Sequence, residues 1–265
     1  MSEKLLNQEE ILTQLTELFK LQNDFQVKAM GQNDWWNVKE MNGKPVNYAI
    51  ATIAEMAEAM ESIDFKWWGT GSDDLVNFGV ELIDMLHFEI SNSMRAMSIR
   101  FNEFSVEKLL EEDNPIIKGL AADIFKSQTN GVSTELNKEE FYTLLLQLVG
   151  ISATLSSKKL YSTPMLAETL VINVRFIFDM LKLLGVSFPE VCNKYKLKNA
   201  LNHVRKLNGY KEGKYLKNWV SVSTGVQDED NKIALELVKG QTLSFKEMIE
   251  LLDGYYKKNI AILVD

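Results

Sequence analysis

Hydrophobic residues recur at intervals of three and four positions over most of this chain of 265 residues. That spacing places them along one face of a helix and is typical of amphipathic helices packed around a core. The pattern predicts helices over eight ranges: 7–30, 47–64, 73–101, 116–128, 137–158, 165–184, 189–208 and 245–262. Since helices account for the periodic segments, we predict an all-α fold, a helical bundle.

Local signals support the ends of several of these helices. Gly31 follows the first helix and suits a stop, while Asn47 is a residue type that caps the start of the second. Gly69 lies in a short break after the second helix, and Ser72 or Asp73 can cap the third. Two helices joined in this way form an αα-hairpin, in which their faces can meet.

Two segments of the sequence give little indication of function. Residues 104–190 have helical periodicity but no chemical motif, and we expect them to serve as scaffold and as dimer surface. Residues 209–243 are polar, aromatic and glycine-containing with little periodicity, which predicts an irregular segment. Because there is no internal repeat or low-complexity tract, residues 1–265 are expected to form a single all-α domain.

Two short pairs of carboxylates lie in apolar stretches of the second and third helices. Glu55 and Glu58 form the first pair, and Glu81 and Asp84 form the second, each at spacing i, i+3. On a helix this spacing points both carboxylates to one side. Four acids on two apolar helices repel one another and resist desolvation, and a divalent cation held by oxygen ligands offsets both costs. Spacing alone is equally compatible with two unrelated surface pairs.

Composition narrows the classes of protein to consider. The chain is 46% hydrophobic and 25% charged, and its formal net charge of −8 argues against a general binder of nucleic acid or anionic membranes. The single cysteine, Cys192, permits no intrachain disulfide, and the first residues lack the pattern of a signal peptide. We therefore expect a cytoplasmic protein. The sequence contains no run of about 18 apolar residues, so we predict no membrane-spanning helix.

A dense set of motif residues lies between positions 47 and 91. Its members are Asn47-Tyr48, Glu55-x-x-Glu58, Glu61-Ser62, Lys66-Trp67-Trp68, Glu81-Leu82-Ile83-Asp84, His87-Phe88 and Ser91. The arrangement resembles the dimeric, all-α dUTPase family within the all-α NTP pyrophosphatase superfamily, whose signature is E-x-x-E, a gap, then E-x-x-D. Phe65 stands where the first tryptophan of the family's W-K-W-W segment is usual.

A second block of resemblance lies in the first helix, at Leu21-Gln22-Asn23-Asp24-Phe25-Gln26. The family carries a similar L-Q-D-x-[LF]-N stretch, and the resemblance implies that Gln22 and Gln26 reach the nucleotide base. Gln26 stands where the family has Asn, so its amide is one methylene longer. Without the other motifs, a polar helix face is the simpler interpretation of the two glutamines.

The third block begins at Lys198 and is similar to the family's K-N-x-L-N-x-x-R-x-x-N-G-Y-K-x-G-x-Y-x-K motif. Helical spacing places Lys198, Asn202 and Arg205 on one face, and Gly209 then permits a turn with positive φ. Such cations suit a triphosphate, although a lysine-rich solvated face is the alternative. The residues expected to bind phosphate are Lys198, Asn202, Arg205, Tyr210, Lys211 and Lys217. Glu229-Asp230-Asn231 is similar to a family G-x-E-D-N segment, at a longer spacing.

The resemblance implies a Mg²⁺-dependent dUTP pyrophosphatase that yields dUMP and pyrophosphate. The four acids would hold about two or three Mg²⁺ ions per site, and Glu55 would take the proton of water that attacks the α-phosphate. Lys66, Trp67 and Trp68 would form a wall beside the nucleotide, the alternative being packing at a helix end. His87 would hydrogen-bond to a metal-binding acid, the alternative being a core histidine.

The family is homodimeric, so the resemblance also implies a homodimer with dUTP or a related dNTP as its ligand. Gln26 motivates a close alternative, a dCTP/dUTP pyrophosphatase or one that acts on another dNTP. A nucleotide-binding regulator without turnover and a helical structural protein are alternatives from other classes. Hydrolysis across a panel of dNTPs, and Mg²⁺-dependent nucleotide binding, separate these functions.

Overall fold

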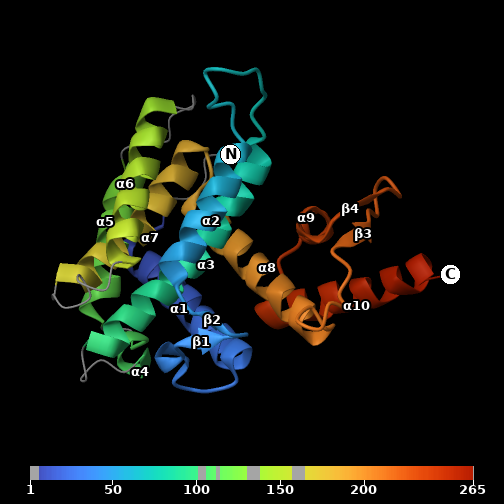
Figure 1. Cartoon of the computed structure of the whole chain (residues 1–265), viewed down its shortest axis with the longest axis horizontal. Helices are drawn as coiled ribbons and strands as arrows, with labels where there is room; N and C mark the ends of the chain where they lie inside the picture. The colour runs from blue at the N-terminus through green and yellow to red at the C-terminus, as the bar shows by residue number, and fades with distance from the viewer. Residues whose placement is uncertain (1–5, 101–105, 112–113, 130–137, 157–164, 265) are drawn as a thin grey trace. The chain divides into compact units, whose positions relative to one another are not determined.

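The computed structural model describes residues 6–100, 106–111, 114–129, 138–156 and 165–264 (Figure 1). Helices take up 71% of the described residues, which confirms the predicted all-α fold. The helices are α1 (Gln8–Met30), α2 (Tyr48–Glu61), α3 (Leu75–Arg100), α4 (Val106–Leu109), α5 (Pro115–Thr129), α6 (Lys138–Ser156), α7 (Met165–Leu183), α8 (Phe188–Leu207), α9 (Asp230–Val238) and α10 (Phe245–Val264). The short elements are the 3-10 helix η1 (Trp35–Asn37) and the strands β1 (Glu40–Met41), β2 (Lys44–Pro45), β3 (Asn218–Val220) and β4 (Gln227–Glu229).

The residues predicted to bound the first two helices, Gly31 and Asn47, do so in the structure. Gly31 closes α1 in the left-handed region, with a φ of 75°, and its amide donates to the carbonyl of Val27. Asn47 caps α2, because its side chain accepts a hydrogen bond from the amide of Ile50 at 3.2 Å. Each of the eight predicted helices has a counterpart in the structure, and only the short helices α4 and α9 fall outside them.

The start of α3 differs from the prediction by the choice of cap. Neither Ser72 nor Asp73 caps this helix; the side chain of Asp74 does so, accepting a hydrogen bond from the amide of Asn77 at 3.0 Å. Asp73 instead accepts from the amide of Asp64 at 2.8 Å, which ties the end of the α2–α3 connection back to its beginning. Asp74 directly follows the two predicted caps and is equally able to cap a helix, so residue type alone does not distinguish these positions.

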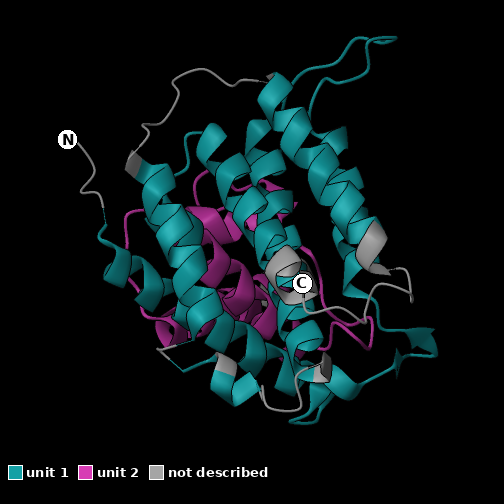
Figure 2. Cartoon of the chain, turned by 90° about the vertical axis from the view of Figure 1, so that its left-hand side faces the viewer, with its two compact units in different colours: residues 1–192 teal, residues 193–265 magenta. Residues whose placement is uncertain are grey.

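The chain divides into two compact units, Met1–Cys192 (unit 1) and Asn193–Asp265 (unit 2), coloured separately in Figure 2. In unit 1, α3 packs against α2, α7 and α1, while α2 and α7 also pack against α6. Most of the α3 side chains between Phe78 and Met97 are buried, so α3 is the central helix of the unit. The antiparallel pairing of α2 with α3 realises the predicted αα-hairpin.

Unit 2 has a hydrophobic core of its own, built from α8, α9, α10 and β3. Its centre is aromatic: the rings of Tyr215 and Tyr256 stack at a centroid distance of 4.6 Å, and Trp219 packs beside both. The predicted irregular segment therefore contains ordered structure, namely the antiparallel pair β3–β4 and helix α9. Strands of three residues and a helix of nine residues are too short to give a clear periodic signal.

Among the described residues, no helix is both long and apolar enough to cross a membrane.

Candidate active site

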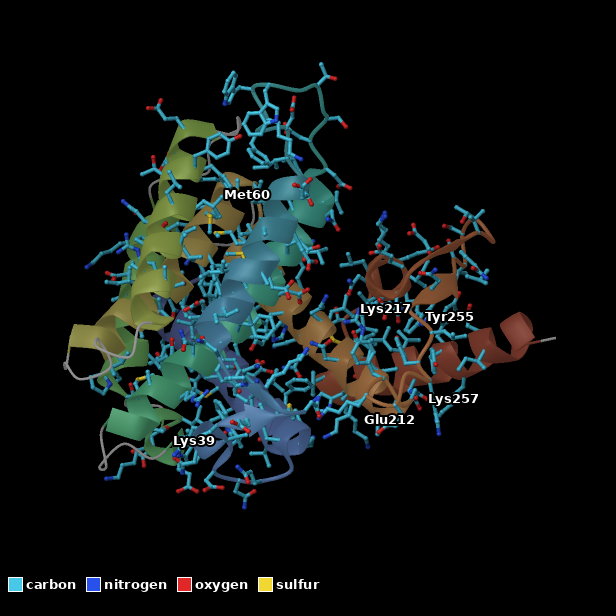
Figure 3. All side chains as sticks on the ribbon, in the orientation of Figure 1. Lys39, Met60, Glu212, Lys217, Tyr255 and Lys257 are labelled. Atoms are coloured by element: carbon cyan, nitrogen blue, oxygen red, sulfur yellow. The ribbon has the colours of Figure 1, made fainter. Side chains whose placement is uncertain are left out.

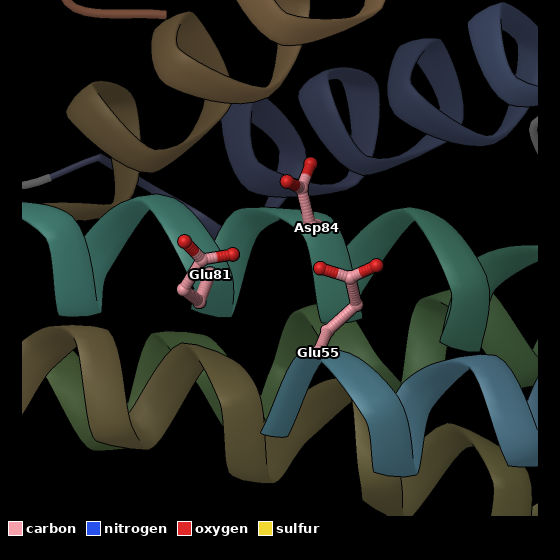
Figure 4. Close-up of side chains that lie close together, drawn as sticks. All are labelled: Glu55, Glu81 and Asp84. Atoms are coloured by element: carbon pink, nitrogen blue, oxygen red, sulfur yellow. The ribbon is translucent and has the colours of Figure 1, made fainter. Parts of the chain in front are cut away.

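Helices α2 and α3 bring three of the four predicted acids together (Figure 4). Glu55 projects from α2, and Glu81 and Asp84 project from α3. Each residue offers a carboxylate oxygen, and these oxygens all lie within 4.8 Å of one another. The three side chains are partly buried, so solvent screens their mutual repulsion less than it would on an open surface.

Glu58, the fourth predicted acid, lies outside this group and is exposed. It is one helical turn beyond Glu55 on α2, so it lies on the same side of that helix. The group of three fits a divalent cation in its donor chemistry, because it offers only oxygen atoms, carries negative charge and has these oxygens within 4.8 Å of one another. Mg²⁺ prefers this donor set, and thiolate or imidazole ligands are absent from the group.

A buried hydrogen-bond network lies on α1 and α3, where the two predicted base-contacting glutamines are found. Gln22 and Gln26 are only 2% and 5% exposed. Their amide nitrogens both donate to the hydroxyl of Ser91, at 2.8 and 3.1 Å, and that hydroxyl donates to the carbonyl of His87 at 2.9 Å. Ser91 thereby holds both glutamines on α1 against α3.

The remaining atoms of the two amides are also held by protein groups. The Gln22 carbonyl lies 2.9 Å from Nδ1 of His87, and since an amide oxygen only accepts, Nδ1 carries the proton. The phenol of Tyr48 donates to the Gln26 carbonyl at 3.1 Å. Burial raises the pKa of the Tyr48 phenol, although nearby Arg95 lowers it, so the phenol stays a donor. His87 is thus linked to the predicted base-contacting residues.

The segment Lys66-Trp67-Trp68 extends from the α2–α3 connection into solvent. Trp67 is 88% exposed and Trp68 is 64% exposed, with their rings edge to face at a centroid distance of 5.5 Å. Lys66 pairs with Glu61 at 2.9 Å. The two tryptophans therefore do not pack at a helix end, and exposed aromatic rings of this size are available to contact a ligand.

In unit 2, two predicted phosphate-binding residues on α8, Lys198 and Arg205, converge on the Asp230-Asn231 pair that begins α9. Arg205 holds Asp230 bidentately, with Nε at 2.9 Å and Nη2 at 2.8 Å from its two carboxylate oxygens. Asn231 Oδ1 accepts from Lys198 at 2.9 Å and from Arg205 at 3.2 Å. Arg205 Nη1 also donates to Asn202 Oδ1 at 3.2 Å. The predicted common face of these residues is therefore present.

Sequence reasoning missed the reason for this convergence. Tyr215 also donates to Asp230, at 2.8 Å, and burial together with the Asp230 charge raises the pKa of its phenol. Asp230 is thus a buried carboxylate that orients the Arg205 guanidinium. The Glu229-Asp230-Asn231 match was the available signal, and its longer spacing obscured the connection to Arg205.

The other predicted phosphate-binding residues are exposed. Gly209 has a φ of 79°, as predicted for the turn after α8, and Tyr210 and Lys211 follow it at the surface. The ammonium of Lys217 lies 5.6 Å from the centroid of the Tyr210 ring, and Lys217 is labelled in Figure 3. Exposed cations of this kind can approach an anionic ligand without a large desolvation cost.

An all-α chain in which a helix pair presents clustered carboxylates has the architecture of an all-α nucleotide pyrophosphatase. A family model described as dUTPase matches residues 14–210, and the chain belongs to this family. The matched range includes the acid group, the buried glutamine network and α8. No curated protein gives a significant match to the chain.

Proposed function

We propose that the protein hydrolyses dUTP to dUMP and pyrophosphate in a Mg²⁺-dependent reaction. The observation that carries this proposal is the convergence of Glu55, Glu81 and Asp84 within 4.8 Å, in a chain of the dUTPase family. Together with Glu58, these acids would hold about two or three Mg²⁺ ions per site. Bound Mg²⁺ supplies neutralisation of phosphate charge and a lowered pKa of coordinated water.

Proton transfer and phosphate binding are assigned to side chains of the protein. Glu55 would accept the proton of the water that attacks the α-phosphate, an assignment that rests on the resemblance to the dUTPase family. The cations Lys198, Arg205, Lys211 and Lys217, with Tyr210 and Asn202, bind the phosphates. Asp230 keeps the Arg205 guanidinium oriented so that less conformational freedom is lost when phosphate binds.

The nucleoside is recognised by residues of unit 1. Gln22 and Gln26 contact the base, Trp67 and Trp68 cover it together with Lys66, and His87 fixes the Gln22 amide. We further propose that the protein acts as a homodimer, as the resemblance to its family implies. Light scattering on the purified chain tests the dimer independently of activity.

A second candidate function, hydrolysis of dCTP as well as dUTP or of another dNTP, is favoured by one observation. Gln26 stands where the family has Asn, so its amide, which hydrogen bonds to Tyr48 and Ser91 hold at both ends, lies one methylene further from the backbone. Pyrophosphate release measured with dUTP, dCTP, dTTP, dATP and dGTP distinguishes the candidates. Turnover of dUTP alone supports the first, similar turnover of dCTP supports the second, and nucleotide binding without turnover supports a regulatory protein instead.

A further inference from the structure

One fully buried carboxyl group of unit 1 plays no part in the function proposed above. Glu89 lies on α3 and is 0% exposed. Three other helices of the unit reach its carboxyl group: the Thr52 hydroxyl from α2 at 2.7 Å, the Ser152 hydroxyl from α6 at 3.3 Å and the Asn173 amide from α7 at 3.2 Å. The Asn173 amide also donates to the Ser152 hydroxyl at 3.3 Å, so these two partners of Glu89 are hydrogen-bonded to each other.

Within the part of the chain that the structure describes, the groups that affect the Glu89 carboxyl are uncharged side chains. Burial raises its pKa, and the hydrogen bonds from Thr52, Asn173, Asn92 and Ser152 lower it. A buried carboxyl group is costly to retain, and an apolar side chain of the same volume would pack there at less cost. Its retention is therefore better explained by specificity of helix placement than by stability.

The network lies on the same contact between α2 and α3 as the acid group. Thr52 precedes Glu55 by three residues on α2, so both side chains lie on one face of that helix. Because α2 and α3 run antiparallel, moving back along α2 from Glu55 to Thr52 corresponds to moving forward along α3 from Asp84 to Glu89. The hydrogen bond between Thr52 and Glu89 thus fixes the longitudinal position of α2 beside α3.

The position of α2 along α3 decides whether Glu55 lies close to Glu81 and Asp84. Sliding one helix by a single turn displaces its side chains by about 5.4 Å. The oxygens of Glu55, Glu81 and Asp84 all lie within 4.8 Å of one another, so such a slip would remove Glu55 from the group. Interchangeable apolar side chains specify this register only weakly, whereas one directional hydrogen bond in a dry core specifies it strongly.

We propose that Glu89 is a positioning residue whose hydrogen bonds to Thr52, Ser152 and Asn173 hold α2 in register with α3 and so keep Glu55 within reach of the metal bound by Glu81 and Asp84. The proposal rests on the proposed metal centre. It also gives α6 and α7, which carry no chemical motif of their own, a part in building the site.

The test uses the full chain with four substitutions. Thr52→Val and Glu89→Leu remove the hydrogen bond with little change of volume, and Glu89→Gln keeps an acceptor at the same place. Leu120→Ala is the matched control, since it opens the buried core on α5, which packs against α1 and α7. Mg²⁺ affinity is measured by titration calorimetry without nucleotide, and hydrogen exchange of the α2 amides is measured in metal-free protein.

We expect Thr52→Val and Glu89→Leu to weaken Mg²⁺ binding about tenfold or more, and Glu89→Gln to restore most of the affinity. Both weakened variants should exchange the α2 amides faster than wild type, while Leu120→Ala lowers the melting temperature without either effect. Unchanged α2 exchange in folded Glu89→Leu, or an equal effect in Leu120→Ala, overturns the positioning role. Wild-type protein that binds no Mg²⁺ instead overturns the proposed function, and α2 exchange still decides whether Glu89 sets the register.

Discussion

At the scale of single residues, charge is balanced differently in the two units. Arg205 is balanced within unit 2 by the bidentate contact with Asp230, which is itself 1% exposed. The acids of unit 1 have the same sign and lie close together, so a bound cation would offset their mutual repulsion. Arg205 is therefore positioned in advance of any ligand, whereas the proposed metal ion would add positive charge to the acid group only when it binds.

Replacing Asp230 with Ala should lower the free energy of unfolding by about 3 kcal/mol, because it leaves the Arg205 guanidinium and the Tyr215 phenol without their shared acceptor. Urea denaturation followed by tryptophan fluorescence measures the change. Lys246→Ala is the control: it breaks an exposed pair with Glu250 and should leave the urea midpoint in place. Equal midpoints for Asp230→Ala and wild type would contradict the structural role of this pair.

Glu89 predicts a dependence of stability on pH. Burial raises its pKa in the folded protein above the ordinary value of 4.5. A group of this kind contributes stability that is fully present below pH 4.5 and is lost as the pH rises through the raised pKa. The urea midpoint of wild type should therefore fall relative to Glu89→Gln as the pH rises above 4.5. A constant difference between the two midpoints would show that Glu89 does not titrate in the folded state.

At the scale of elements, hydrophobic periodicity in the sequence predicts where the helices lie, but it does not predict which side chains of different helices contact one another. The apolar spacing of α1, α2 and α3 predicts where these helices run, because each buries one face against the core. The acid pairs were found because carboxylates in apolar helices need an explanation. Glu89 gave no such signal, since one acid in an apolar stretch has no spacing partner and Thr52, Ser152 and Asn173 are far from it in sequence. Only folding brings those positions together.

The α2–α3 connection predicts an effect on substrate binding without an effect on stability. Trp67→Ala should raise the KM for dUTP about tenfold, because a base that stacks on the ring loses that contact. Since Trp67 is 88% exposed, the free energy of unfolding should change by less than about 0.5 kcal/mol. Steady-state kinetics and urea denaturation measure the two quantities.

Two controls accompany the Trp67 variant. Val222→Ala removes an exposed apolar side chain from unit 2 and should leave KM unchanged. Trp35→Ala removes a buried indole that donates to Asn23, and it should cost about 3–5 kcal/mol of stability. An unchanged KM for Trp67→Ala would remove the tryptophan from the proposed nucleotide wall.

At the scale of the whole molecule, the proposed metal binding predicts an effect on stability. The three carboxylates have the same charge and lie close together, and Mg²⁺ binding at the proposed site would both offset their repulsion and stabilise the folded state by mass action. At a Mg²⁺ concentration of 100 times Kd the gain is about 2.7 kcal/mol. The native chain is thus expected to be less stable without metal than a chain lacking one of these acids.

Glu81→Gln should therefore raise the melting temperature in EDTA, by an amount equivalent to about 1 kcal/mol, and should abolish most of the increase that Mg²⁺ gives wild type. Scanning calorimetry with EDTA and with Mg²⁺ measures both effects. Glu250→Gln, an exposed substitution on α10, should retain the wild-type Mg²⁺ response. A Glu81→Gln protein that is less stable than wild type in EDTA would show that the acids are not under mutual repulsion.

The central claim is that the acid group carries a Mg²⁺-dependent attack of water on dUTP. Pyrophosphate release from dUTP, measured with purified wild type and Glu55→Gln across a Mg²⁺ titration, tests it most directly. Wild type should release pyrophosphate only with Mg²⁺ and form one dUMP for each pyrophosphate, while Glu55→Gln should lose about 100-fold or more in kcat. Wild type that releases no pyrophosphate, or Glu55→Gln that keeps full activity, would contradict it.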